Sequence, residues 1–181
     1  MEVRESFIKG LLEITPRIFK DDRGYFYESH SKREFEKIGI THEFVQDNQS
    51  YSIPNVVRGL HFQRPPFSQA KLVRVLKGKV LDVAVDLRRN SPTFGQYDSV
   101  ILDAELGNMF FVPEGFAHGF AALEEAVFHY KCTNFYHKDS ESGICYNDPD
   151  LKIDWKIKDP IVSDKDLVLK TLSELKKASE I

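Results

Sequence analysis

The chain has 181 residues, of which 41% are hydrophobic and 29% are charged, a composition typical of one globular domain with a real core. Its 25 Lys and Arg against 28 Asp and Glu give a net charge of −3, which disfavours a nucleic-acid partner because phosphate binding needs a basic surface. No apolar run approaches the ~20 residues of a membrane span, the first residues lack the apolar core of a signal peptide, and two cysteines without a Cys-x-x-Cys pair fit a reducing compartment. We therefore expect a single domain over residues 1–181, located in the cytoplasm, with no membrane or nucleic-acid partner.

The first half of the chain predicts a short helix followed by strands. Residues 31–38 form the expected helix, because Ser31 and Glu34 have the spacing of a capping box and Gly39 provides a stop. Strands are predicted over residues 43–48, 55–63 and 72–76, the last ending in the turn signal at 77–79.

The clearest strand signal lies at residues 81–88, where four apolar residues alternate with Asp82, Ala84, Asp86 and Arg88. This period of two gives one apolar and one polar face. Further strands are predicted at 99–102, 109–112, 118–123 and 126–135, and a helix at 164–178. Many short strands separated by turn residues indicate a mainly β sandwich or barrel with short helical additions.

His61 is the first candidate functional residue. It is flanked by Leu60 and Phe62, so it points to the opposite face of its strand, which Gln63 and Val57 should share. A lone histidine on such a strand is more often an inert, hydrogen-bonded core residue. Arg58 and Lys71 nearby, together with Gln63, favour a functional role, because core strands rarely carry so many polar residues without a purpose.

A second histidine, His118, follows a Pro/Gly turn. The spacing from Gly107 through Pro113 and Gly115 to His118 is that of the second motif of cupins, which are double-sheet jelly rolls. Metal-binding cupins pair this histidine with a His-x-His sequence, but here the third position is Gln63, a poor ligand for transition metals. We therefore expect His118 to contact or support a substrate, and we expect no metal.

Tyr130 lies on the more apolar face of its strand, with Ala126, Phe128 and Cys132. If that face points inward, its phenol enters the interior of the barrel. It is then either an ordinary core tyrosine with its hydroxyl paired, or a general acid, since a phenol with a pKa near ~10 stays protonated at neutral pH. No Gly-x-Gly-x-x-Gly, P-loop, Gly-x-Ser-x-Gly or His-Glu-x-x-His signature occurs.

These motifs, taken together, resemble the dTDP-4-dehydrorhamnose 3,5-epimerase family over nearly the whole chain. The matching blocks are residues 22–26, 46–48, 58–63, 69–73, 82–88, 91–95, 113–120, 130–133, 147–149, 153–155 and 163–166. The resemblance implies a cupin-type jelly roll, a homodimer, a dTDP-sugar substrate, and no metal or organic cofactor.

The resemblance also implies a mechanism. In the family a base removes a proton next to the C4 ketone of a dTDP-linked 4-keto-6-deoxyhexose, an enolate forms, and an acid returns a proton to the other face. His61 resembles the base and Asp166 its orienting partner, by the logic of hydrolase triads. Tyr130 resembles the acid, and Lys71 would face the C4 oxygen, where negative charge develops.

Binding residues follow from the resemblance in the same way. The positions that match family contacts to nucleotide, diphosphate and sugar are Arg23, Glu28, Gln46, Asn48, Arg58, His118, Glu141 and Lys165. Arginine suits a diphosphate because its guanidinium binds oxygen atoms in pairs. The strand with Arg23 and Glu28 is expected to reach across the dimer.

Several alternatives stay open at this point. A single epimerase acting at C3 or C5 would keep the same base and acid. A cupin ketoisomerase on a similar substrate matches the motifs less well. In a sugar-binding module the combination of His61, Lys71, Tyr130 and Asp166 would be superfluous, and a metal-dependent cupin lacks one histidine.

Overall fold

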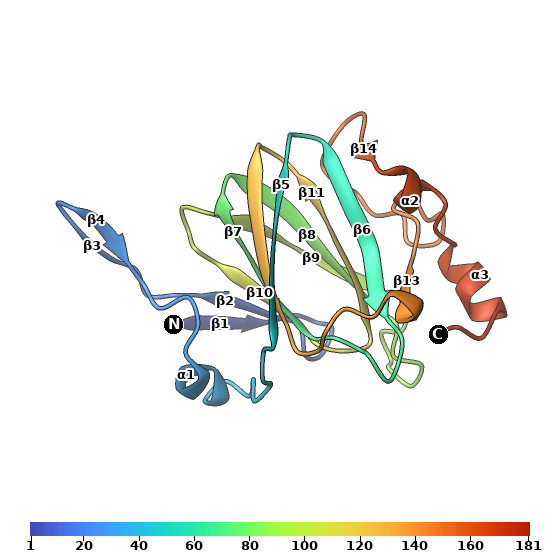
Figure 1. The fold of residues 1–181 in the computed structure, drawn as a ribbon, viewed down its shortest axis with the longest axis horizontal. Helices are drawn as coiled ribbons and strands as arrows, with labels where there is room; N and C mark the ends of the chain where they lie inside the picture. Colours follow the sequence, from blue (N-terminus) through green and yellow to red (C-terminus); the bar gives the residue numbers. More distant parts are fainter.

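The computed structural model describes residues 1–181 and consists mainly of two facing β-sheets (Figure 1). The first sheet contains, in spatial order, β1 (Glu2–Glu5), β2 (Leu12–Thr15), β10 (Met109–Val112), β7 (Lys71–Lys77), β12 (Ala126–Cys132) and β5 (Gln46–Ser52). The second contains β13 (Glu141–Gly143), β6 (Val56–Gln63), β11 (Phe116–Ala122), β8 (Lys79–Asp86) and β9 (Tyr97–Asp103), with β14 (Ile161–Val162) parallel to β6. This is a mainly β, cupin-type jelly roll, as the sequence predicts.

A small hairpin projects from this body. It is formed by β3 (Phe19–Asp21) and β4 (Gly24–Phe26), which pair only with each other. In Figure 1 the hairpin points away from the sheets, and its aromatic side chains Phe19, Tyr25 and Phe26 are exposed. The hairpin therefore pairs with no strand of the two main sheets.

The main core lies between the two sheets. Val73 and Val75 of β7 and Phe128 of β12 pack against Phe116 and Phe120 of β11, and all five are buried. Burying each such side chain contributes about 1.5–3 kcal/mol. The even-numbered face of β12 therefore points inward and carries Tyr130 with it.

A second core covers the outer face of β8. Leu81, Val83 and Val85 pack there against Trp155 and Leu175 of the C-terminal segment. The polar face of β8, with Asp82 and Asp86, consequently points toward the inside, and both carboxylates are fully buried. The alternation in the sequence is confirmed, and the structure shows that its polar face is the inner one.

The helices are shorter than the sequence predicts. The helix at 31–38 is α1 (Lys32–Glu36), and the Ser31 side chain makes no capping hydrogen bond. The helix predicted at 164–178 is two helices, α2 (Asp164–Leu167) and α3 (Leu172–Lys177), with a 3₁₀ turn η1 (Lys138–Ser140) elsewhere. The single helix is wrong because Lys170 pairs with Ile144 and Thr171 starts a new helix with a complete capping box.

Strand limits differ in two places. The strand predicted at 43–48 begins only at Gln46, because Phe44 packs against the cluster under α1. The strand predicted at 126–135 ends at Cys132, where its pairing with β5 and β7 stops.

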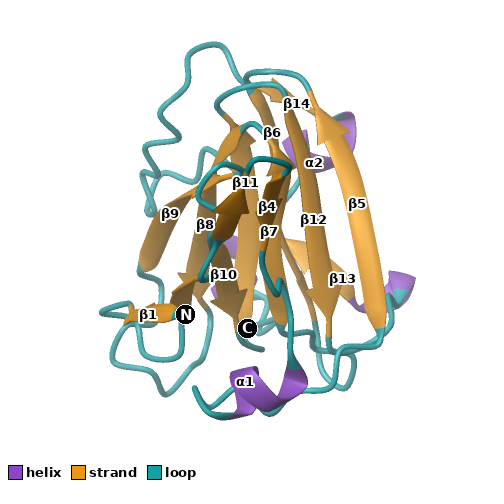
Figure 2. Cartoon of the chain, turned by 90° about the vertical axis from the view of Figure 1, so that its left-hand side faces the viewer, coloured by secondary structure: helices purple, strands orange, loops and turns teal.

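Figure 2 shows α1 at one end of the strands and α2 beside β14 and β6. None of the helices has the length and apolar character needed to cross a bilayer.

Candidate active site

A cavity of about 630 Å³ opens between the sheets. Its polar lining includes residues from both sheets and from α2, namely Asn48, Arg58, His61, Lys71, His118, Tyr130, Lys165 and Asp166. A smaller cavity of about 170 Å³ shares Asn48, His61, Lys71 and Tyr130 with it and adds Gln46 and Glu141. The two are neighbouring parts of one site, and they unite ten of the twelve residues that the sequence singles out.

A bulge in β6 aims Arg58 and His61 into this site. His61 pairs with His118 and Arg58 with Phe120, so three steps along β6 match two along β11. The extra residue falls next to Gly59, whose φ is +122° and where a Cβ would lie 2.6 Å from the Cα of Gly119. Only glycine fits that close approach.

The bulge also corrects one prediction. His118 and Phe120 lie on the same face of β11, so their partners His61 and Arg58 share a face as well. Val57 pairs with Ala121 and packs in the outer core. The expectation that Val57 shares the face of His61 is therefore wrong, because the extra residue reverses the alternation.

His61 is held by Asp166. The Nε2 atom of His61 donates to Asp166 Oδ1 at 2.7 Å, and the Gly59 amide donates to Asp166 Oδ2 at 3.2 Å. The Ser163 hydroxyl caps α2 by accepting from the Asp166 backbone amide. This cap fixes the backbone that carries the Asp166 carboxylate. Burial acts to raise the pKa of Asp166, but the hydrogen bond and charge of His61 outweigh it and hold the pKa below its ordinary value.

Lys71 and Tyr130 come from the opposite sheet. The Lys71 ammonium lies 5.9 Å from the centre of the Tyr130 ring, and Lys71 pairs across the strands with Cys132. Burial lowers the pKa of Lys71 and raises the pKa of Tyr130. Lys71 makes no hydrogen bond to another side chain, so its ammonium is available to a bound molecule.

His118 is more deeply buried than His61 and has its own carboxylate. Its Nε2 donates to both oxygens of Asp82, at 2.8 and 3.0 Å. Asp82 is a site residue that the sequence reasoning missed, since its alternation looked the same as that of Asp86. The signal that could have identified it is its position two residues before the inward-facing Ala84.

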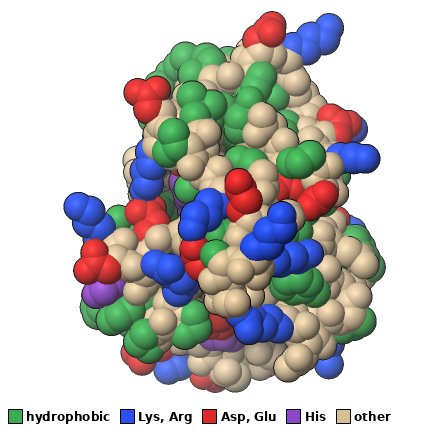
Figure 3. Space-filling model, turned by 90° about the vertical axis from the view of Figure 1, so that its right-hand side faces the viewer, with side chains coloured by type: hydrophobic (Ala, Val, Ile, Leu, Met, Phe, Trp, Pro, Cys, Tyr) green, Lys and Arg blue, Asp and Glu red, His purple; other side chains and the backbone are tan.

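The rim of the site carries the remaining polar residues. Lys165 donates to Glu141 at 2.6 Å, and the hydroxyl of Tyr136, which the sequence reasoning did not select, donates to the same carboxylate at 2.8 Å. Arg58 donates to the Ser52 hydroxyl at 3.1 Å. Figure 3 shows the face that carries the C-terminal elements, with acidic and basic side chains intermixed near its centre.

Arg23 and Glu28 do not reach this cavity within the chain. Arg23 lies at the tip of the exposed hairpin, where its side chain is 89% exposed and pairs with Asp21. Glu28 follows β4 and lines neither cavity. No group of three or more His, Cys, Asp or Glu side chains is arranged to hold a metal ion.

The site is that of a small-molecule enzyme built on a cupin-type barrel. A family model described as dTDP-4-dehydrorhamnose 3,5-epimerase matches residues 5–174. The dTDP-4-dehydrorhamnose 3,5-epimerase of Escherichia coli is 50% identical over 178 residues, which cover 97% of this chain and 96% of that protein. The chain belongs to the dTDP-4-dehydrorhamnose 3,5-epimerase family and is therefore an enzyme of the isomerase class.

Solved structures agree with this assignment. The dTDP-6-deoxy-D-glucose-3,5-epimerase from Legionella pneumophila, in complex with dTDP-4-keto-L-rhamnose, superposes with a TM-score of 0.91 at 48% identity, covering 95% of this chain and 93% of that one. A 3′-monoepimerase from Streptomyces bikiniensis, in complex with dTDP-quinovose, has a TM-score of 0.90 at only 31% identity, covering 96% and 89%. The chain is more similar in sequence to the double epimerase.

Proposed function

We propose that this protein, acting as one domain over residues 1–181, converts dTDP-4-dehydro-6-deoxy-D-glucose to dTDP-4-dehydro-L-rhamnose in dTDP-L-rhamnose biosynthesis, without a cofactor. The observation that carries the proposal is the placement of His61 on one sheet and of Lys71 and Tyr130 on the other, facing one cavity. Inversion of a carbon next to a ketone needs a base and an acid on opposite sides of the sugar ring, and the two sheets supply them.

His61 is the base in this proposal. Its Nε2 is occupied by Asp166, which leaves Nδ1 as the nitrogen that removes a proton from the sugar. The buried carboxylate stabilises the imidazolium that forms, because an ion pair in a site with little water is stronger than in bulk solvent. As the C–H bond breaks, its electrons move to the C4 oxygen and produce the enolate.

Lys71 and Tyr130 act on the enolate. The ammonium of Lys71, free of a protein partner, stabilises the negative oxygen more than the neutral ketone, and this difference lowers the barrier. Tyr130 then donates its phenolic proton to the carbon from the opposite face. Burial raises the pKa of Tyr130, so the phenol stays protonated until the enolate is present.

The remaining residues are proposed to bind the substrate. Arg58 and Lys165 would contact the diphosphate, whereas Gln46, Asn48, His118 and Glu141 would contact the sugar and base. Two free thiols, Cys132 and Cys145, are consistent with a protein that works in the reducing cytoplasm.

We further infer a homodimer in which the hairpin of one protomer reaches the cavity of the other. The hairpin exposes Tyr25 and Phe26 at 67% and 66% and pairs with no other strand of its own chain, which is unfavourable unless a partner covers it. This arrangement would bring Arg23 and Glu28 to the nucleotide. A monomer in light scattering at micromolar concentration would contradict it.

The alternative of a single epimerase keeps the same base and acid, so the position of inversion must be measured. The substrate is incubated with the enzyme in heavy water and the sugar is analysed by NMR. Inversion with deuterium at both C3 and C5 is expected. Label and inversion at one carbon would support a single epimerase, and neither would point to a ketoisomerase or a binding module.

A further inference from the structure

The rim loop, residues 133–140, contributes to the wall of the smaller cavity without belonging to either sheet. It runs from the end of β12 at Cys132 to the start of β13 at Glu141. Its Tyr136 lines the cavity and donates its hydroxyl to Glu141 at 2.8 Å. A backbone outside the strand ladders must find its hydrogen bonds elsewhere, so the partners of this loop decide where Tyr136 lies.

Gln63, at the end of β6, makes the most contacts to the rim loop. Its Nε2 donates to the Phe135 carbonyl at 3.2 Å and to the Phe67 carbonyl at 2.8 Å, and its Oε1 accepts from the His137 amide at 2.6 Å. The side chain is buried, so removing the carboxamide would leave three backbone groups without their partner. Gln63 thus ties the rim loop to the loop after β6, and the rings of Phe67 and His137 stack between the two loops with centroids 3.8 Å apart.

Two further glutamines hold the residues on either side of Phe135. Gln69 Nε2 donates to the Asn134 carbonyl at 2.7 Å, and Gln46 Oε1 accepts from the Tyr136 amide at 3.1 Å. With the two contacts of Gln63, each of the four residues 134–137 has a backbone group held by a glutamine side chain. All three glutamines also line the smaller cavity, so the same side chains form its wall and support its rim.

We propose that Gln63 is a positioning residue of the active site, whose carboxamide holds the rim loop so that Tyr136 and Glu141 face the substrate before it binds. This role rests on the proposed epimerase function, which defines the substrate. It also accounts for a polar residue at a position where metal-binding cupins carry a histidine of their His-x-His sequence. A loop that is ordered in advance does not have to be ordered at the expense of affinity.

The contacts predict an effect on binding rather than on chemistry. The base His61 is held by Asp166, and the hydrogen bonds of the rim loop involve neither Lys71 nor Tyr130. Without the Gln63 carboxamide the substrate has to order the loop as it binds, which raises KM and leaves kcat nearly unchanged. A residue that only stabilised the fold would lower the melting temperature without changing KM.

The experiment compares Gln63→Met with Asn108→Leu. Asn108 is a matched control, because its buried carboxamide also holds a loop through three hydrogen bonds, with Glu13, the Ile101 carbonyl and the Asp103 amide, and it lines neither cavity of the site. For Gln63→Met we expect KM for the dTDP-sugar to rise by roughly 10- to 100-fold, with kcat within about 3-fold of wild type. Asn108→Leu should lower the melting temperature and keep the wild-type KM.

Hydrogen exchange of the rim-loop amides gives a second readout that does not need turnover. We expect exchange at residues 134–137 to be faster in Gln63→Met than in the wild type, and unchanged in Asn108→Leu. Gln69→Met removes one contact instead of three, so it should change exchange and KM in the same direction but less. If Gln63→Met does not fold, Gln69→Met decides by the same criteria.

The outcomes separate this proposal from the function on which it rests. A wild-type enzyme without turnover would remove the proposed function, and the affinity for dTDP, measured by calorimetry, would then replace KM as the test of Gln63. With an active wild type, an unchanged KM in folded Gln63→Met would overturn the positioning role, whatever the exchange rates. Unchanged exchange at residues 134–137 would overturn it as well.

Discussion

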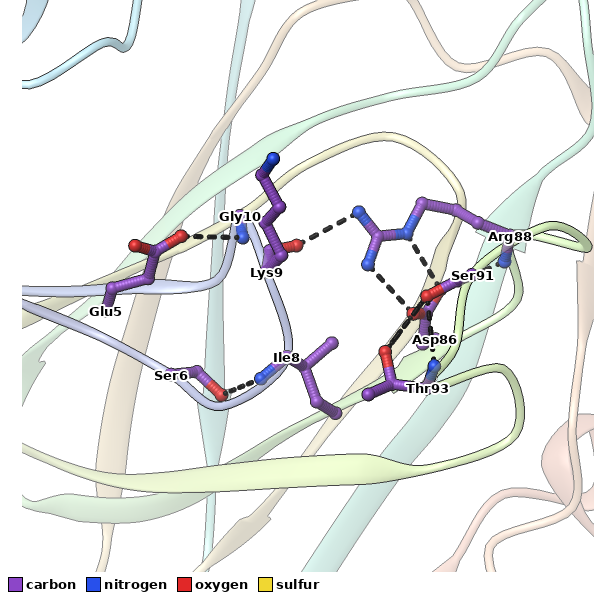
Figure 4. Close-up of polar contacts among 9 residues, drawn as sticks. All are labelled: Glu5, Ser6, Ile8, Lys9, Gly10, Asp86, Arg88, Ser91 and Thr93. Carbon is purple, nitrogen blue, oxygen red and sulfur yellow. Dashed lines mark hydrogen bonds and ion pairs between the residues drawn. The ribbon is translucent and has the colours of Figure 1, made fainter.

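Strand β8 carries two aspartates, Asp82 and Asp86, in very different surroundings. Asp86, at one end, accepts hydrogen bonds from the Arg88 guanidinium at 2.8 Å through both Nε and Nη2, from the Arg88 amide at 3.0 Å, and from the hydroxyls of Ser91 and Thr93 (Figure 4). Asp82, four residues earlier, accepts only from His118. Both carboxylates are fully buried, so burial alone does not distinguish a structural from a functional carboxylate.

The pKa values of the two groups move in opposite directions. Burial raises the pKa of Asp82, and His118 and Lys71 only partly oppose this effect. At Asp86 burial acts in the same sense, but the hydrogen bonds outweigh it and lower the pKa to about 2. A fully satisfied carboxylate stabilises the fold, whereas a poorly satisfied one beside a cavity can influence the charge of its neighbours.

Asp86 serves the fold because its partners belong to loops. Its ion pair holds Arg88 so that the Arg88 Nη1 also donates to the Lys9 carbonyl at 3.0 Å, tying the turn after β1 to the end of β8. Figure 4 shows this connection. The block at residues 91–95 matches the family but has no role in the site. Its Ser91 and Thr93 hydroxyls donate to Asp86, which gives the block a structural role.

The largest effect that tests the comparison is expected at His61, which pairs with His118, the hydrogen-bond partner of Asp82. We expect His61→Ala to reduce turnover by about 10⁴-fold or more, because it removes the base together with its pairing to Asp166. Affinity for dTDP, measured by calorimetry, should change little, since the imidazole is assigned to the sugar. Near-wild-type turnover would show that His61 is not the base.

Tyr130→Phe is expected to have the next largest effect. Loss of the phenolic proton should slow product formation by roughly 10²–10⁴-fold, while the ring still packs against Phe128. Product formation by NMR and the melting temperature measure the two consequences separately. A large drop in melting temperature with unchanged turnover per folded molecule would make Tyr130 a core residue only.

Asp86→Asn should act on stability and hardly on chemistry. The lowered pKa is worth about 2 kcal/mol at neutral pH, which for a domain of this size is a drop of about 4–8 °C in melting temperature. Because the folded pKa is depressed, this stabilisation is present above the unfolded pKa near ~3.9 and is lost as the pH falls toward about 2. Wild type and variant should therefore converge in stability at low pH. A constant difference down to pH 2 would contradict the assignment.

The sequence predicts much of this molecule but not the features that distinguish Asp82 from Asp86. The barrel, most strands and the set of candidate residues follow from alternation, turn signals and the family resemblance. The pairing of His61 with Asp166, which are 105 residues apart, follows from the family resemblance and from no local pattern in the sequence. The bulge at Gly59 reverses the face of Val57, and the pairing of Lys170 with Ile144 divides the last helix, both because tertiary contacts override local pattern.

The central claim is that a base and an acid face the sugar from opposite sheets. It is tested most directly by incubating the substrate in heavy water with His61→Ala and with Tyr130→Phe, side by side, and measuring deuterium at C3 and C5. The account predicts no exchange with His61→Ala, and exchange without efficient inversion with Tyr130→Phe. Exchange that persists at the wild-type rate without His61 would contradict it.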